Sequence, residues 1–216
     1  AFGGNKARHY EYLFADIKAK GYDAYINIMD WRSNNARLTA AACNKAGLRY
    51  ILVLRGGKGR PFQGNMLVDH LLGAEMHLLG DVTGQEANQY ARGLADTLRA
   101  EGWKPYLITE QEFTLYAGAV AYAQAALELK DQLDAVGVGA VRIFGVAGRS
   151  TSGLALTAKN LGFPWHVTGI TVSDEVDYDQ YIFGKIDEAA RMLGFPSSLD
   201  RKDMEILDQY VGPGYG

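Results

Sequence analysis

The chain has 216 residues, of which 48% are hydrophobic and 22% charged, and its formal net charge is −3 at pH 7. This is the composition of an ordinary globular protein with enough apolar material for a sizeable core. The small negative charge gives no reason to expect nucleic acid or an anionic membrane surface as a partner. No apolar run approaches the roughly 20 residues that span a bilayer, and we expect no signal peptide.

The cysteine content bears on the redox environment. Cys43 is the only cysteine in the sequence, so an internal disulfide is excluded and a reducing compartment is favoured. We therefore expect a cytoplasmic protein. Cys43 lies in a run of small residues with helical character, which favours a buried apolar side chain over a reactive thiol.

Hydrophobic periodicity, capping residues and glycine breaks divide the chain into alternating helices and strands. The expected helices are Lys6–Lys20, one capped by Ser33 or Asn34 that runs to Ala46, Asn65–Leu72, Gln85–Glu101, Tyr116–Val136, Thr151–Leu161 and Asp177–Leu193. The expected strands are Ala24–Met29, Arg49–Leu54, Glu75–Leu79, Tyr106–Ile108, Ala140–Val146, Val167–Val172 and Met204–Ile206. This alternation with short connections predicts an α/β fold with parallel sheets flanked by helices.

The stretch from Gly3 to Arg8 combines two glycines with a lysine at an expected helix start. Glycines allow a tight turn or a close approach to a ligand, and Asn5 is a good N-cap residue. Lys6 would then lie in the first helical turn, where the positive end of the helix dipole disfavours an ammonium. A neutral lysine amine can attack a carbonyl to form a Schiff base. The alternative is a solvated lysine on a surface helix.

Two further stretches could bind a phosphate. The first, Gly145–Gly153, follows an expected strand and opens a helix, where backbone N–H groups beside hydroxyls bind anions. It lacks the dinucleotide fingerprint, and an ordinary strand-to-helix turn is the alternative. The second, Arg55–Pro61, is basic and rich in glycine, but it lacks the P-loop spacing and is interpreted as a surface loop.

Several motifs occur in one order along the chain and together resemble a known family. They are Gly3-Gly4-Asn5-Lys6-Ala7-Arg8, Ser33-Asn34-Asn35-Ala36-Arg37, Gln63-Gly64-Asn65-Met66-Leu67-Val68-Asp69-His70-Leu71-Leu72-Gly73-Ala74-Glu75, Ala125-Ala126-Leu127-Glu128-Leu129 and Gly212-Pro213-Gly214-Tyr215-Gly216. This combination resembles the D-cysteine desulfhydrase and 1-aminocyclopropane-1-carboxylate deaminase family. These are pyridoxal 5′-phosphate (PLP) enzymes of fold type II, similar to the tryptophan synthase β subunit.

The resemblance assigns roles to residues of the site. Lys6 matches the Schiff-base lysine, and Asn5 beside it is expected to bind the cofactor. Ser33 matches a serine that faces the substrate, and Asn34 an asparagine that hydrogen-bonds the cofactor's phenolic oxygen; both could instead be helix caps only. The loop residues Val146, Ala147, Gly148, Arg149 and Ser150 match the segment that holds the cofactor phosphate. Tyr215 matches a tyrosine that approaches the substrate.

The sequence departs from the family pattern mainly around the substrate. Arg32 stands where a glutamine is usual, and Glu112-Phe113-Thr114-Leu115 replace a Gly-Gly-Ser-Asn segment. Arg149 replaces a small residue, so it either strengthens anion binding or points to solvent. His9 replaces a lysine one turn after Lys6, where it is either a nearby base or a surface histidine.

The resemblance implies a large PLP-binding domain, residues 1–29 and 106–216, and a smaller mobile domain, residues 30–105. It also implies that the chain is truncated at both ends and that the protein is a homodimer. We expect no metal, because no histidine has a partner at metal-ligand spacing. The group that faces the pyridine nitrogen is expected beyond residue 216.

The function implied is a PLP-dependent lyase or deaminase acting on a small amino acid, cysteine-like or 1-aminocyclopropane-1-carboxylate-like. It would release ammonia and a 2-oxo acid, with sulfide from a cysteine. Two alternatives stay open at this point. One is a homologue that binds PLP but has lost turnover, and the other is a phosphate-ligand-binding α/β protein outside this family.

Overall fold

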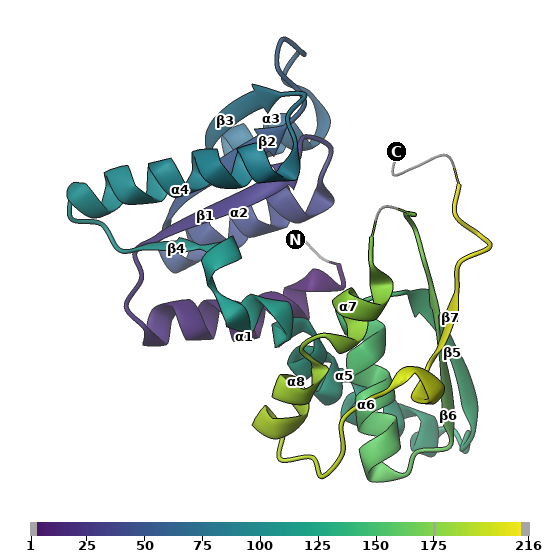
Figure 1. The fold of residues 1–216 in the computed structure, drawn as a ribbon. Helices are drawn as coiled ribbons and strands as arrows, with labels where there is room; N and C mark the ends of the chain where they lie inside the picture. The colour runs from purple at the N-terminus through teal and green to yellow at the C-terminus, as the bar shows by residue number, and fades with distance from the viewer. Residues whose placement is uncertain (1–3, 175, 213–216) are drawn as a thin grey trace. The chain divides into compact units, whose positions relative to one another are not determined.

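The computed structural model describes residues 4–174 and 176–212, which form two compact units, Ala1–Thr114 and Leu115–Gly216. Figure 1 shows the elements of each unit. Both units are built from parallel strands joined through helices, so the predicted α/β class is confirmed. Within the described residues, no helix is long and apolar enough to cross a membrane.

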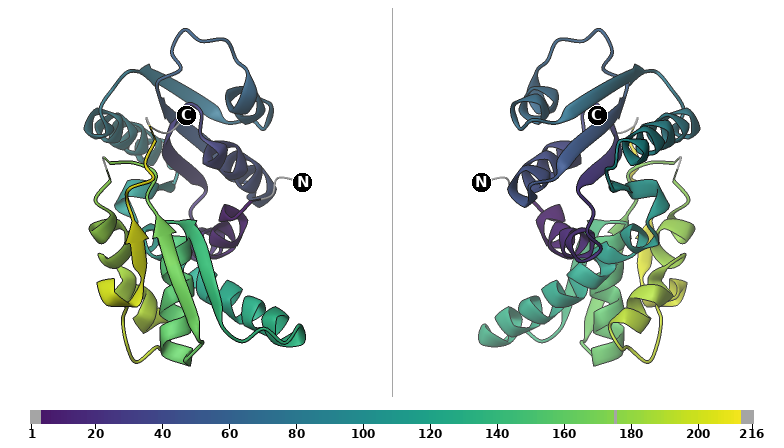
Figure 2. Two further views of the ribbon diagram at one scale, coloured as in Figure 1. Left: turned by 90° about the vertical axis from the view of Figure 1, so that its right-hand side faces the viewer. Right: turned by 90° about the vertical axis from the view of Figure 1, so that its left-hand side faces the viewer.

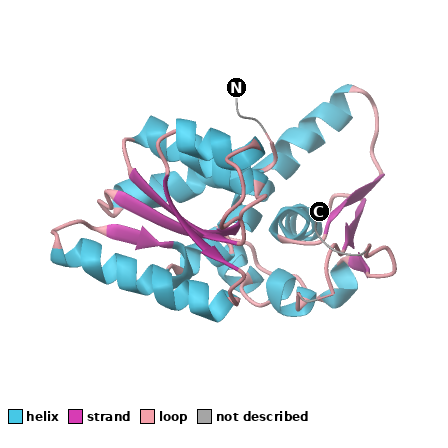
Figure 3. Ribbon diagram, turned by 90° about the horizontal axis from the view of Figure 1, so that it is seen from above, coloured by secondary structure: helices cyan, strands magenta, loops and turns pink. Residues whose placement is uncertain are grey.

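The first unit contains a four-stranded parallel sheet in the order β3-β2-β1-β4. Its strands are β1 (Ala24–Asp30), β2 (Arg49–Arg55), β3 (Glu75–Gly80) and β4 (Pro105–Leu107). Its helices are α1 (Lys6–Ala19), α2 (Asn34–Ala46), α3 (Gly64–Leu71) and α4 (Gly84–Ala100), followed by the 3₁₀ turns η1 (Ile108–Glu110) and η2 (Glu112–Leu115). Figure 3 shows this sheet with helices on both faces.

Alternation along the strands supplies both faces of this sheet with apolar side chains. Tyr25 and Tyr50 point to the face where α1, α2 and α3 contribute their apolar residues. Ile26 and Ile51, one position further along each strand, point to the opposite face. There α4 presents a row of buried side chains at four-residue spacing: Ala87, Ala91, Ala95 and, three residues further, Leu98. The strands are therefore apolar almost throughout, which is why they could be recognised from the sequence.

The second unit contains a three-stranded parallel sheet, in which β5 (Val141–Val146), β6 (Trp165–Ile170) and β7 (Glu205–Leu207) lie side by side (Figure 2). Its helices are α5 (Ala117–Ala135), α6 (Arg149–Leu161), α7 (Tyr178–Phe183) and α8 (Ile186–Met192), with a 3₁₀ turn η3 (Arg201–Asp203) before β7. Gly153 of α6 meets Ala119 of α5, where a Cβ would lie 2.4 Å from the Ala119 carbonyl oxygen. The close packing of these two helices therefore requires a glycine at this position.

The sequence was wrong about one helix and missed the three 3₁₀ turns η1, η2 and η3. Residues 177–193 form α7 and α8 rather than one helix, because the chain breaks at Gly184, a poor helix former, and at Lys185, whose φ is −137°. Residues 108–115 form η1 and η2, which have too little periodicity to be found in a sequence. The expected domain of residues 30–105 stays a prediction. The compact units divide after Thr114, and β1 pairs with β2 in one sheet.

A buried carboxyl group lies between α3 and the rest of the first unit. Asp69 is fully buried and neither of its carboxylate oxygens has a hydrogen-bond partner among the described residues. Burial raises its pKa from 3.8 to about 7, against the opposing influence of Arg37. At neutral pH this group therefore holds its proton about half of the time, whereas it is ionised in the unfolded chain.

We predict that Asp69→Asn removes a pH dependence of stability. The contribution of Asp69 to the free energy of unfolding should fall as pH rises from about 4 to about 7 and stay level above that, because only the unfolded state ionises this group in the interval. The total contribution is at most about 4 kcal/mol. Urea denaturation across this pH range measures it, and an unchanged slope in the variant would contradict the assignment.

Candidate active site

The order of strands in the first sheet creates a place for a ligand. The chain passes from β1 to β2 and β3 on one side, whereas β4 lies on the other side of β1. In such sheets the connections diverge at the switch between neighbouring strands and leave a crevice at their carboxyl ends. Here the switch lies between β1 and β4. Residues that follow these two strands are therefore the candidates for ligand contact.

Ser33 lies directly after β1, at the start of α2. It is the N-cap of this helix, in an extended conformation (φ −62°, ψ 121°), and its hydroxyl oxygen accepts hydrogen bonds from the N–H groups of Asn35 and Ala36 at 3.1 and 3.4 Å. Its hydroxyl also donates to the sulfur of Met29 at 3.6 Å. The predicted capping role of Ser33 is therefore confirmed. Its contact with a substrate stays a prediction.

Asn34 is the first residue of α2 and is exposed. Its side-chain oxygen accepts a hydrogen bond of 3.1 Å from Asn65, at the start of α3. The same amide of Asn65 donates to the carbonyl oxygen of Arg32 at 2.7 Å. The motif around Asn65 therefore braces the Ser33–Asn34 turn from a neighbouring helix, which orients the amide of Asn34.

Lys6 is the first residue of α1, so its predicted position at a helix start is confirmed. Its side chain is half-buried. Asn5 occupies the N-cap position, but the capping role expected of its side chain is wrong. Its backbone is helical (φ −57°, ψ −28°) and the side chain makes no capping hydrogen bond, because capping requires an extended backbone at this position. His9 is half-buried and its ring stacks on Tyr10, with the centroids 5.7 Å apart.

A hydrogen-bond network connects α1 with the start of α2. The hydroxyl of Tyr10 donates to the side chain of Asn35 and is hydrogen-bonded to Thr39. Thr39 in turn donates to the backbone oxygen of Asn35 at 2.9 Å. The helix that begins at Lys6 is thereby fixed to the helix that begins at Asn34, within one unit.

The second glycine-rich loop lies in the other unit, where β5 leads into α6. The N–H of Ala147 is bonded to the carbonyl of Ile170 at 2.8 Å, and the N–H of Gly148 to the hydroxyl of Thr151 at 3.1 Å. The first N–H groups of a helix have no intrahelical acceptor, which leaves those of Arg149 and Ser150 for an anion. The phosphate clamp of Val146–Ser150 stays a prediction.

Thr151 is a residue of this loop whose role the sequence did not reveal. Besides accepting from Gly148, its hydroxyl donates to the carbonyl oxygens of Val146 and Gly148, at 3.2 and 2.9 Å respectively. A Cβ at Gly145 would lie 2.8 Å from its methyl group. Thr151 therefore fixes the turn, and a threonine three residues after a loop glycine is a capping signal that could have been recognised.

Arg149 does not point to solvent as a free side chain. Its guanidinium carbon lies 4.6 Å from the ring centroid of Tyr181, and its Nε is buried without a hydrogen-bond partner among the described residues. Burial lowers the pKa of this guanidinium below its usual value. A buried cation at a helix start is unfavourable unless an anion accompanies it.

The predicted substrate-side Tyr215 lies outside the described residues.

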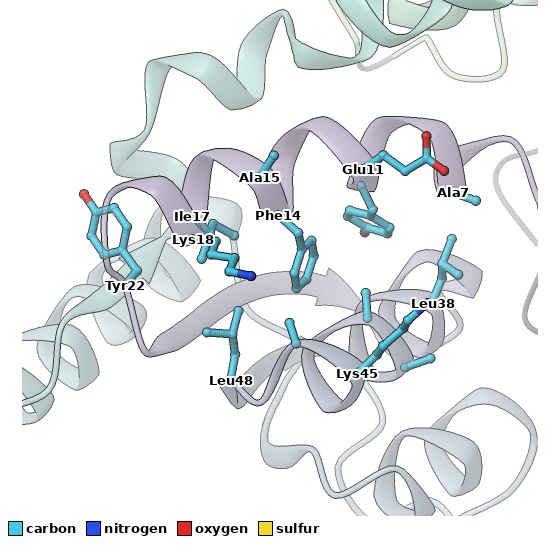
Figure 4. Close-up of a pocket in the computed structure, with 14 residues that line it drawn as sticks. Ala7, Glu11, Phe14, Ala15, Ile17, Lys18, Tyr22, Leu38, Lys45 and Leu48 are labelled. Atoms are coloured by element: carbon cyan, nitrogen blue, oxygen red, sulfur yellow. The ribbon is translucent and has the colours of Figure 1, made fainter.

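A pocket of about 960 Å³ lies between α1 and α2 and is lined mainly by apolar side chains such as Phe14, Ile17 and Leu38 (Figure 4). None of the predicted site residues in the described ranges lines it. In residues 4–174 and 176–212, no three acidic, histidine or cysteine side chains come together as a metal site requires.

Each unit by itself offers donors that fit one part of PLP. A phosphate monoester requires N–H groups and a cation, and the Arg149–Ser150 turn offers both. An aldehyde requires a primary amine, and Lys6 at a helix start offers one. The amide of Asn34, held by Asn65, offers a hydrogen bond for a phenolic oxygen.

Comparison with known proteins gives relatives that match most or all of the chain. A Pyrococcus horikoshii protein provisionally named 1-aminocyclopropane-1-carboxylate deaminase is 33% identical over 196 residues, 89% of this chain and 58% of that protein. D-cysteine desulfhydrase of Salmonella choleraesuis is 29% identical over 222 residues, 100% of this chain and 66% of the enzyme. The chain thus spans between about half and two thirds of the length of these relatives.

Solved structures of related proteins share the fold of this chain. The crystal structure of an ACC deaminase homologue has a TM-score of 0.80 and 31% identity, over 95% of this chain and 62% of that one. Threonine deaminase isoform 2 of Solanum lycopersicum shares the fold alone, with a TM-score of 0.56 and 20% identity over 78% of this chain and 45% of that one. The family of pyridoxal-phosphate dependent enzymes matches residues 1–216. The family expected from the motifs is confirmed, and the chain belongs to the pyridoxal-phosphate dependent enzymes.

Proposed function

We propose that this protein is a PLP-dependent lyase or deaminase that acts on a small amino acid and releases ammonia and a 2-oxo acid, with sulfide from a cysteine-like substrate. The observation that carries the proposal is the position of Ser33 and Asn34 after β1, at the switch in the strand order. A phosphate-binding protein outside this family is excluded by the family match. A homodimer and a cytoplasmic location, the latter supported by the single buried thiol of Cys43, belong to the same proposal.

Each residue has a stated task in this proposal. Lys6 would hold the cofactor covalently through its amine, and the same amine would move the proton of the substrate α-carbon. Asn34 hydrogen-bonds the phenolic oxygen, and the Arg149–Ser150 turn binds the phosphate. Ser33 and Tyr215 face the substrate. When bound, PLP supplies an electron sink for the carbanion at the α-carbon.

The competing candidate is a family member that binds PLP without turnover. The observation in its favour is η2, because Glu112–Leu115 form a 3₁₀ turn after β4, where the sequence lacks the family's Gly-Gly-Ser-Asn segment. Turnover on a panel of D- and L-amino acids, followed as ammonia and 2-oxo acid, separates the two. Release from any small amino acid supports the lyase, whereas cofactor binding without release from the whole panel supports its competitor.

We predict that Lys6→Ala abolishes turnover and the absorbance of lysine-bound cofactor at roughly 410–420 nm. The amine is the only group in the proposal that bonds the cofactor aldehyde, so its loss leaves at most noncovalent binding. Lys18→Ala is the matched control, since Lys18 is an exposed lysine of the same helix. Retention of the absorbance in Lys6→Ala would reject the assignment.

We predict that Ser33→Ala lowers turnover by on the order of 10²-fold or more with nearly intact PLP binding, as loss of a positioned acid–base group does. The same change should also cost about 1 kcal/mol of stability, because Ser33 caps α2.

Two further variants separate the effect on turnover from the effect on stability. Ser33→Asn keeps a capping oxygen but no hydroxyl, so turnover should still fall. Thr83→Ala removes the cap of α4 and should leave turnover unchanged. Normal turnover in Ser33→Ala would mean that Ser33 is a cap only.

A further inference from the structure

Tyr181 lies against the phosphate loop of the second unit. It belongs to α7, which begins at the N-cap Asp177. The hydroxyl of Tyr178 accepts a hydrogen bond of 2.9 Å from the N–H of Val172, just after β6, so α7 is fixed near the carboxyl end of that strand. A Cβ at Gly148 would lie 3.1 Å from Cε1 of Tyr181. The ring therefore occupies the space that a side chain at Gly148 would need.

The same ring supports the side chain of Arg149. The guanidinium carbon lies 4.6 Å from the ring centroid, within the range of a cation–π interaction. At its other end, the side chain packs on the start of α5, where a Cβ at Gly118 would lie 2.9 Å from Cβ of Arg149. Arg149 is thus held at both ends, by a glycine of α5 and by the ring of Tyr181.

This arrangement holds the Arg149 guanidinium at a position where the surrounding protein does not stabilise a positive charge. Arg149 is the first residue of α6, beside the positive end of its dipole, and its partly buried guanidinium faces no acidic side chain among the described residues. Its Nε–H has no acceptor there. An anion with several acceptor oxygens would offset these costs at once.

We propose that Tyr181 is a positioning residue of the phosphate site, which holds the Arg149 guanidinium against the first turn of α6 so that it pairs with a phosphate monoester dianion. This inference rests on the proposed function, because the dianion is that of PLP. The turn offers backbone N–H groups, the Ser150 hydroxyl and the guanidinium, which together match a group with three equivalent oxygens. A carboxylate would use only part of this set.

The test compares the affinities for PLP and for pyridoxal, which lacks the phosphate, measured by absorbance titration on the full protein. The dissociation constant of pyridoxal divided by that of PLP isolates the phosphate contribution and does not depend on turnover. The variants are Tyr181→Met, Tyr181→Phe, Arg149→Met and the double variant Tyr181→Met/Arg149→Met. Phe163→Met is the matched control, because Phe163 also lies against a cation, Lys130, and follows the end of α6 that is remote from Arg149.

We expect Tyr181→Met to lower this ratio by on the order of tenfold, and Tyr181→Phe, which keeps the ring, to leave it nearly unchanged. Arg149→Met should lower the ratio by at least as much, and the double variant should lose no more than Arg149→Met alone. Should Tyr181→Met fail to fold, as judged by circular dichroism, Tyr181→Leu replaces it. Phe163→Met should keep the native ratio.

The results that overturn the inference differ from those that overturn the proposed function. If the native protein binds PLP no more tightly than pyridoxal, the phosphate site itself is wrong. If the native ratio is large but Tyr181→Met or Tyr181→Leu keeps it, the positioning role of Tyr181 is wrong and the phosphate site stands. Additive losses in the double variant would also contradict the inference, since Tyr181 would then act independently of Arg149.

Discussion

The positive ends of helix dipoles are the feature on which the candidate site depends. Lys6, Ser33 and Arg149 each stand at the start of a helix, where backbone donors face away from the helix and the dipole is positive. Such positions suit a phosphate, a phenolate and a neutral amine, and they disfavour free cations. Ser33 satisfies the donors of its own helix, whereas Arg149 adds a charge to the start of another. Ser33 and Arg149 therefore differ in what they offer a ligand, a hydroxyl in the first case and a positive charge in the second.

Parallel strands bring these helix starts to defined places. In the first unit, apolar residues on both faces of the sheet hold α2 and α4 on opposite sides, and this division produces the switch beside β1. In the second unit, the close contact of Gly153 with α5 fixes α6 behind the glycine-rich turn that follows β5. Packing far from the chemistry thus determines where Ser33 and Ser150 lie. Substitutions such as Gly153→Ala would act on the site through this packing.

Sequence reasoning succeeded where the determinants are local. The strands β1 and β2 are short and rich in apolar residues, and Ser33 is a capping residue in front of a helical pattern, so both could be predicted. The role of Tyr181 could not, because its partner Arg149 lies 32 positions earlier and no spacing links them. Asn5 failed for a different reason, since a good capping residue has no effect when its own backbone is helical. The break at Gly184 between α7 and α8 was missed because the helical spacing of apolar residues continues across it in the sequence.

The central claim is that Lys6 carries the cofactor, and chemical trapping tests it most directly. Incubating the full protein with PLP, reducing it with borohydride and mapping the peptides by mass spectrometry locates the modified lysine. The account predicts a single phosphopyridoxyl group on Lys6 at one equivalent per chain. Stoichiometric labelling of another lysine, or no labelling above that of the denatured protein, would contradict it.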